Sequence, residues 1–176
     1  GFGAKLALGS RRLAELYGAP ELSMSVKALE MPAYDPRGAK GIGLDYATAN
    51  RGGCHVTGYT IAPEILGLPQ KIDPLTPEGK AQWVKIFQDL TCVVNSAVNC
   101  LFTTFEIGAK DYVELFNTIA GFNFTENDVM KIGERIYNLE RYIMSLYGFT
   151  AKDDTLPPRL LREPMPEGPA KGQVVE

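Results

Sequence analysis

Apolar residues recur along much of this chain at the steps of three and four that mark one face of a helix. The longest series follows Thr125 and consists of Val129, Ile132, Ile136, Leu139, Ile143 and Leu146. Because Asp128 stands three residues after Thr125, nearly as in a capping box, we expect a long helix to begin at Thr125. Core packing is the simplest interpretation of its apolar stripe, although a partner helix could also use it.

A wider apolar face follows Thr76-Pro77, a pair that is typical of a helix start. Its members are Trp83, Ile86, Phe87, Leu90, Val93, Val94 and Ala97. So wide a face predicts a deeply buried helix. A shorter helix near Lys110 to Ala120, closed by Gly121, is expected between this helix and the long one.

The start of the chain predicts one helix and one short strand. Residues 2–17 carry Phe2, Leu6, Leu13 and Leu16 at mostly helical spacing, and Gly18 is a suitable C-terminal stop. Residues 22–28 alternate apolar and polar side chains, which is typical of a short strand. Prolines at positions 32 and 36 should end that strand.

The end of the chain is rich in proline. From Thr150 onward, prolines at positions 157, 158, 164, 166 and 169 argue against regular structure. We therefore expect a mainly α fold, with an irregular multi-helix C-terminal domain over residues 1–149 that includes the short strand. Residues 150–176 should form an extended proline-rich tail packed on that domain.

Composition excludes several classes of protein. With 176 residues, 45% of them hydrophobic, the chain can bury a substantial core. Its net charge of -3, without a basic run, argues against nucleic-acid binding. No apolar run approaches the roughly 20 residues that cross a bilayer, and no signal-peptide pattern is present, so we expect no membrane span and a cytoplasmic location. Three cysteines without paired spacing fit a reducing compartment.

The only histidine, His55, is the first candidate for chemistry. Asp35-Pro36 predicts the start of a helix that runs toward Asn50 and stops at Gly52-Gly53, which leaves His55 just beyond the helix end. A lone histidine is most often a hydrogen-bonded structural residue. Here, however, glycine-flexible backbone could approach a bulky ligand closely, which favours a functional site.

The segment around this histidine resembles the tungsten- or molybdenum-dependent aldehyde:ferredoxin oxidoreductase family. That family's C-terminal region carries K-G-L-E-x-P-A-Y-D-P-R-G and then R-G-x-C-H, and this chain reads KALEMPAYDPRG and then RGGCH. Residues 133–141, GERIYNLER, and residues 153–159, DDTLPPR, extend the resemblance over nearly the whole chain. The chain begins Gly-Phe-Gly without methionine, and we expect a fragment or one piece of a cleaved chain.

The resemblance implies an enzyme that oxidises small aldehydes to carboxylates at a tungsten or molybdenum bis-pterin. Electrons would leave through a 4Fe-4S cluster to ferredoxin or an electron-transfer subunit. The missing N-terminal part would supply most of the pterin-binding surface and three of the four cluster ligands. His55 would be the catalytic residue that donates or accepts the proton, since an ordinary histidine pKa allows both near neutrality.

The resemblance assigns a second site to the end of the buried helix. The family's D-x-x-G-L-C motif aligns with Asn95-Ser96-Ala97-Val98-Asn99-Cys100, so Cys100 would be the fourth ligand of the 4Fe-4S cluster and Asn95 and Asn99 would face the cofactor. Without the resemblance, the simplest interpretation of a lone cysteine here is a small buried hydrophobic residue. Asparagine lacks the charge of the family's aspartate, which should weaken or rearrange pterin binding. Valine lacks glycine's freedom at positive φ, so the family's turn is not expected here. Both changes indicate a divergent subgroup.

Several alternatives stay open. The same scaffold could reduce carboxylates or rings, or the chain could be a non-catalytic helical assembly module, and a homodimer remains among the expected assemblies. Of the other cysteines, Cys92 should be packing, and Cys54 is a weak candidate for a place near the metal.

Overall fold

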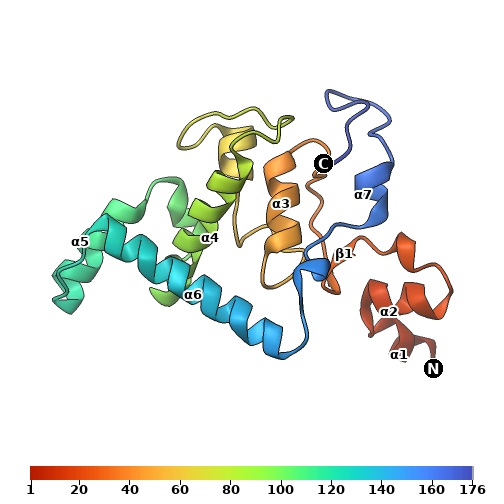
Figure 1. Ribbon diagram of the computed structural model, residues 1–176, viewed down its shortest axis with the longest axis horizontal. Coiled ribbons are helices and arrows are strands. Elements are labelled where there is room, and N and C mark those ends of the chain that lie inside the picture. The colour runs from red at the N-terminus through yellow and green to blue at the C-terminus, as the bar shows by residue number, and fades with distance from the viewer. Residues whose placement is uncertain (176) are drawn as a thin grey trace.

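The structure is a computed structural model that describes residues 1–175, and Glu176, the last residue of the predicted tail, lies outside them (Figure 1). Its helices are α1 (Phe2–Leu6), α2 (Gly9–Leu16), α3 (Lys40–Thr48), α4 (Lys80–Ser96), α5 (Ala109–Ala120), α6 (Glu126–Leu146) and α7 (Pro158–Arg162). Short helical turns are η1 (Pro20–Leu22), η2 (Ala62–Leu66), η3 (Leu101–Phe105) and η4 (Ala151–Asp153). Strands β1 (Ser25–Val26) and β2 (Leu29–Glu30) form the only sheet in the described part, so the mainly α prediction is confirmed.

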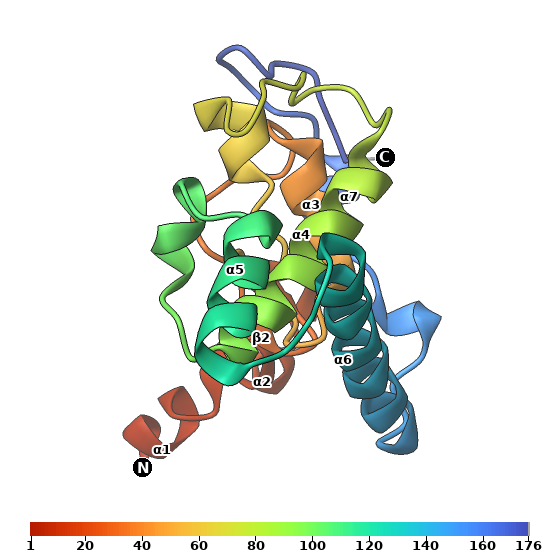
Figure 2. The same ribbon diagram turned by 90° about the vertical axis from the view of Figure 1, so that its left-hand side faces the viewer.

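Helices α3 and α4 lie side by side at the centre, and α6 crosses α4 (Figure 1). Turned by 90°, the view shows α5 and α6 on either side of α4 (Figure 2). One buried cluster joins α3, β1 and the tail through Ile42, Tyr46, Val26, Leu156, Leu160 and Val175. A second joins α4, α5 and α6 through Val93, Val94, Tyr112 and Val129.

Helix α6 begins as the sequence predicts. Thr125 is its N-cap residue and accepts a hydrogen bond from the backbone N–H of Asp128, while the Asp128 carboxylate accepts from the Thr125 N–H at 2.9 Å. The core-packing interpretation of its stripe holds only for the first half. Val129 is fully buried, but Leu139 is 58% exposed and Leu146 is 68% exposed.

The predicted N-terminal helix is interrupted. Instead of one helix over residues 2–17, α1 ends at Leu6 and α2 begins at Gly9, whose φ of +83° lies in the left-handed region. A glycine there turns the chain between the two helices. The stop at Gly18 is confirmed, with a φ of +73°.

The predicted strand is present only at Ser25–Val26. It pairs in antiparallel register with β2, Ser25 opposite Glu30 and Val26 opposite Leu29. Lys27 and Ala28 form the turn between the strands, and both have positive φ. The Lys27 ammonium donates to the Ala47 carbonyl and pairs with Asp154 at 2.9 Å, which ties this turn to α3 and the tail.

The predicted start of α3 is wrong by several residues. Asp35 accepts from the backbone N–H of Arg37 at 2.9 Å within a turn, and regular helix begins only at Lys40. The cap comes from a distant residue, because the buried Glu64 carboxylate accepts from the N–H groups of Gly41 and Ile42. Helix α4 likewise begins later than Thr76, at Lys80.

Proline does not exclude helix throughout the tail. Pro158 is the first residue of α7, a position that needs no backbone N–H donor and suits proline's fixed φ. Leu156, Leu160 and Val175 pack with the buried residues of α3. The division of the chain at residue 150 stays a prediction. No helix within residues 1–175 is both long and apolar enough to cross a membrane.

Candidate functional site

His55 lies on a loop between α3 and η2 that is anchored on both sides of the histidine. Before it, the Gly53 N–H donates to the Val26 carbonyl of β1 at 3.2 Å. After it, the Gly58 N–H donates to the Asp45 carboxylate of α3 at 3.0 Å. A Cβ on Gly53 would lie 2.8 Å from the Leu29 carbonyl, and one on Gly58 would lie 2.5 Å from Asp45 Oδ1. The glycines therefore permit close packing of the loop against the hairpin and α3.

The His55 imidazole is partly exposed and forms a cluster of three rings with two tyrosines. Its ring centroid is 5.7 Å from that of Tyr34 and 6.2 Å from that of Tyr59. Burial, and secondarily the charge of Arg51, lower the pKa of His55 below its usual value. The imidazole is therefore mostly neutral at pH 7, the form that can accept a proton.

Tyr34 and Tyr59 are themselves linked, with their hydroxyl oxygens 3.5 Å apart. Burial and the bond to Tyr34 raise the pKa of Tyr59 to about 12. Both effects keep the Tyr59 hydroxyl protonated near neutral pH. The Tyr46 hydroxyl donates to the Tyr34 carbonyl at 3.3 Å, which attaches this part of the chain to α3.

Cys100 follows the turn that ends α4, and it is exposed. Its N–H donates to Asn99 Oδ1 at 2.9 Å. The Asn99 amide nitrogen donates to the Tyr112 hydroxyl at 3.0 Å and to Thr103 Oγ1 at 3.3 Å. Asn99 therefore holds the Cys100 backbone in place through contacts inside the fold. Asn95, in the last turn of α4, is exposed.

Val98 adopts the turn conformation that we expected only glycine to supply. Its φ is +53°, and the N–H of Asn99 reaches back to the Val94 carbonyl while the N–H of Val98 reaches the Asn95 carbonyl. These two bonds form a Schellman motif, whose left-handed position is usually glycine. The expectation that valine prevents such a turn is wrong. The side chain is 93% exposed, so it meets no packing obstacle.

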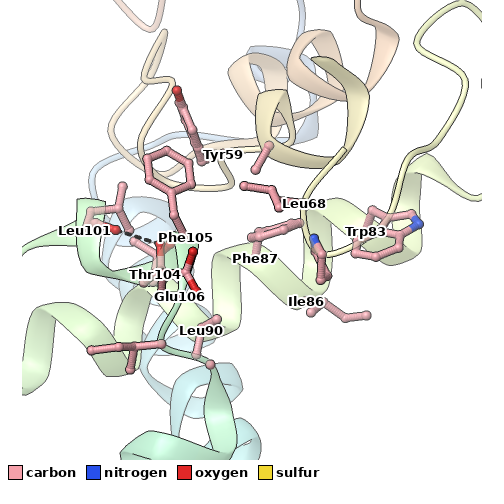
Figure 3. Close-up of a pocket in the computed structure, with 15 residues that line it drawn as sticks. Tyr59, Leu68, Trp83, Ile86, Phe87, Leu90, Leu101, Thr104, Phe105 and Glu106 are labelled. Atoms are coloured by element: carbon pink, nitrogen blue, oxygen red, sulfur yellow. Dashed lines mark hydrogen bonds between the residues drawn. The ribbon is translucent and has the colours of Figure 1, made fainter. Parts of the chain in front are cut away.

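Residues that follow His55 and Cys100 in the sequence line one apolar cavity of about 200 Å³, whereas His55 and Cys100 themselves lie outside its lining. Tyr59, which touches His55, lies 5.8 Å from Phe105 between ring centroids, and both line the cavity. Phe105 closes η3, the turn that begins directly after Cys100. Figure 3 shows Tyr59 and Phe105 next to one another, with Leu101 beside them. The loop of His55 and the segment of Cys100 are thus joined by aromatic contacts.

One face of α4 forms the opposite wall of the cavity, including Trp83, Phe87 and Leu90 (Figure 3). The wide apolar face of this helix was expected to be deeply buried. Val93 and Val94 are buried, but Trp83, Phe87 and Leu90 are only partly covered because they line the cavity. The remaining lining residues are mostly apolar, which suits a ligand with an apolar group.

The other two cysteines lie inside the fold. Cys54 and Cys92 are both buried and unpaired. The packing interpretation of Cys92 is confirmed, and burial raises the pKa of its thiol to about 12. Among residues 1–175, no group of three or more histidine, cysteine or acidic side chains could hold a metal ion. Of the three cysteines in the described part of the chain, Cys100 is the exposed one.

Two buried carboxylates near the site were missed by the sequence analysis. Glu64 caps α3, and Asp45 binds the loop of His55. An acidic residue within the apolar run from Ile42 to Ala47 is the one signal that could have indicated Asp45. No local pattern indicates the role of Glu64, because the N–H groups that it caps lie more than 20 positions earlier in the chain.

Comparison with known proteins gives a match over the whole sequence. Residues 1–176 match the family model described as aldehyde ferredoxin oxidoreductase, domains 2 and 3. A tungsten-containing aldehyde ferredoxin oxidoreductase of Pyrococcus furiosus is 60% identical over 99% of this chain, and one of Thermococcus kodakarensis is 57% identical over 98%. A third, of Pyrococcus abyssi, is 55% identical over 99%. The chain spans 29% of the length of each of these relatives.

Proposed function

We propose, because the chain belongs to the aldehyde ferredoxin oxidoreductase family, that it forms the C-terminal part of an enzyme that oxidises aldehydes to carboxylates. The observation that carries this proposal is the cavity shared by two segments. The His55 loop contributes Tyr59 to its wall, and the segment after Cys100 contributes Leu101 and Phe105. An aldehyde bound there would contact both the loop that carries His55 and the segment that follows Cys100.

His55 is proposed to accept a proton from the water that adds to the aldehyde carbonyl. Aldehyde and water yield a carboxylic acid, two protons and two electrons, so a base near the carbonyl carbon is required. The lowered pKa keeps the imidazole neutral at pH 7 and ready to accept. Tyr34 and Tyr59 limit the positions of its ring.

A tungsten or molybdenum bis-pterin, when bound, supplies the acceptor for the two electrons. Asn95 is the residue of this chain proposed to contact it, since its exposed amide can both donate and accept hydrogen bonds. Asn99 is proposed to act less directly. Its amide nitrogen is already engaged with Tyr112 and Thr103, and its oxygen retains capacity for one further bond.

Cys100 is proposed to provide one ligand of a 4Fe-4S cluster that passes electrons to ferredoxin. Its position fits that role, because it is exposed on a turn fixed by Asn99 and is not engaged in a disulfide. The other ligands would come from the part of the enzyme outside this chain, since residues 1–175 hold no group of three or more side chains that could bind a metal.

The cavity is proposed to receive the apolar group of the aldehyde. Leu68, Trp83, Phe87 and Leu90 offer aliphatic and aromatic surface opposite Tyr59 and Phe105 (Figure 3). Glu106 lies at one edge of the lining. Burying an apolar chain here would contribute binding energy remote from the reacting carbonyl.

The test is the His55→Ala variant of the full-length enzyme. Loss of a general base is expected to lower kcat for aldehyde oxidation by about 10²- to 10⁴-fold. Tungsten content per protein should stay at the wild-type value, because His55 is proposed to move a proton and not to hold the metal. A variant that contains its metal and retains full turnover would refute this role of His55.

A further inference from the structure

Asp45 is an unusual residue in this fold because its fully buried carboxylate has only uncharged partners. Oδ2 accepts from the Gly58 N–H at 3.0 Å, and Oδ1 accepts from the Gln88 side-chain amide at 3.0 Å. No ion pair to Asp45 is formed within residues 1–175. Placing a carboxylate in such surroundings is costly, so the residue needs an explanation other than stability.

The two hydrogen bonds of Asp45 connect α3, α4 and the loop of His55. Gln88 belongs to α4, and its amide also donates to Thr48 Oγ1 at 3.0 Å. Gly58 stands three residues after His55. The carboxylate therefore fixes the loop to the two central helices on one side of the histidine, while the hairpin fixes it on the other through Gly53.

Gly58 is adapted to this contact. A Cβ there would lie 2.5 Å from Asp45 Oδ1 and 3.0 Å from Gln88 Cγ, so any larger residue would push the loop away from the helices. Because only a few residues separate Gly53 from Gly58, a shift at Gly58 moves the backbone of His55 and the ring that projects from it.

We propose that Asp45 is a positioning residue for His55, which it holds beside Tyr59 of the cavity wall through the backbone of Gly58. This role rests on the proposed function of His55. A small displacement of a catalytic group can cost as much as about 100-fold in rate, which gives the enzyme a reason to retain a costly buried carboxylate. Asp45 itself touches neither the cavity nor His55, and it acts only through the loop.

The experiment compares three variants of the full-length enzyme. Asp45→Ala removes the acceptor of the Gly58 N–H. Asp45→Asn keeps an acceptor oxygen for the Gly58 N–H and gives up the acceptor of the Gln88 amide, so it isolates the contact with the loop. Tyr137→Phe is the matched control, because it deletes a 2.8 Å hydrogen bond from α6 to the Thr48 carbonyl in the same region without touching the loop.

Two readouts are measured, amide hydrogen exchange in peptides that cover residues 52–59 and the steady-state constants for aldehyde oxidation. Asp45→Ala is expected to speed exchange in these peptides by about tenfold or more and to lower kcat by about 10- to 100-fold, with KM changed less than about threefold. Asp45→Asn should restore both readouts nearly to wild type. Tyr137→Phe should leave both unchanged even where it lowers Tm.

Unchanged exchange in Asp45→Ala, or an equal kcat loss in Tyr137→Phe, would overturn the proposal. If exchange rises but turnover does not fall, His55→Ala separates the causes. If kcat falls in His55→Ala, His55 is catalytic and the positioning role of Asp45 is refuted. If His55→Ala keeps full turnover, the proposed function of His55 is itself refuted. Should Asp45→Ala fail to fold, Gly58→Ala displaces the same contact with the carboxylate in place, and the same pair of changes is expected.

Discussion

Glu64 and Lys80 form an ion pair with an oxygen-to-nitrogen distance of 2.8 Å, and both side chains are almost wholly buried. Glu64 at the same time caps α3, and the Lys80 ammonium also donates to the Asp73 carbonyl. This pair joins the start of α3 to the start of α4, and these two helices carry the anchors of the His55 loop. Its integrity therefore matters for the site as well as for stability.

Breaking this pair should be strongly destabilising. Glu64→Gln or Lys80→Met would leave one buried charge without its partner, at an expected cost of about 3–5 kcal/mol in the free energy of unfolding. Denaturant unfolding of each variant measures this loss of stability. The exposed pair of Arg12 and Glu15 offers the control, because solvent screens it and Arg12→Ala should cost far less. Equal costs at the two sites would contradict the importance of burial.

Relief of backbone strain should stabilise the turn before Cys100. Val98→Gly removes a β-branched residue from a φ of +53°, and we expect a gain of about 1 kcal/mol in the free energy of unfolding. Thermal unfolding would detect it. Val98→Ala keeps a Cβ at positive φ and should gain less. A Val98→Gly protein that is less stable than wild type would mean that this valine is not strained.

Asp45 should also make stability depend on pH. Burial raises its pKa from the ordinary 3.8 to about 7, so the folded state keeps a proton that the unfolded chain has already released. The stability that this proton provides is complete below pH 3.8 and is lost as the pH rises to about 7. Asp45→Asn cannot ionise, so its stability relative to wild type should increase from pH 5 to pH 8 by roughly 2 kcal/mol. Comparing the two proteins at each pH cancels the other titrating groups, and a constant difference would contradict the prediction.

The cavity should select among aldehydes by size. Leu90→Phe adds bulk to a wall residue, and we expect KM to rise about tenfold for a long apolar aldehyde such as hexanal while acetaldehyde is little affected. Steady-state kinetics of the full-length enzyme with both substrates measures this. Leu139→Phe, on the exposed part of α6, is the control. A parallel change for both aldehydes would argue against the cavity as the binding site of the apolar group.

The sequence predicted those elements whose signals are local. The capping box of Thr125 and Asp128, and the glycine stops at positions 18 and 121, were found because each lies within one turn of the helix end that it determines. The start of α3 was missed because Glu64, which caps it, comes from a later segment. No local pattern encodes such a contact.

In the candidate site, too, contacts between distant segments were not predictable from the sequence. Residue types and the family resemblance indicated His55 and Cys100, but not that aromatic contacts of Tyr59 and Phe105 would join their segments. The turn at Val98 was misjudged because propensity disfavours valine at positive φ, whereas the Schellman hydrogen bonds and the open surroundings accommodate it. Tertiary structure overrides local preference there.

Cys100 is proposed to contribute this chain's ligand to a redox centre, and the metal content of the full-length enzyme tests that role. Iron and tungsten per protein should be compared in wild type, Cys100→Ser and Cys92→Ser, all purified without oxygen. We predict about four irons in wild type and in the Cys92 control, and a clear loss of iron with a changed cluster signal in Cys100→Ser. Wild-type iron content and an unaltered cluster signal in Cys100→Ser would show that Cys100 is not a cluster ligand.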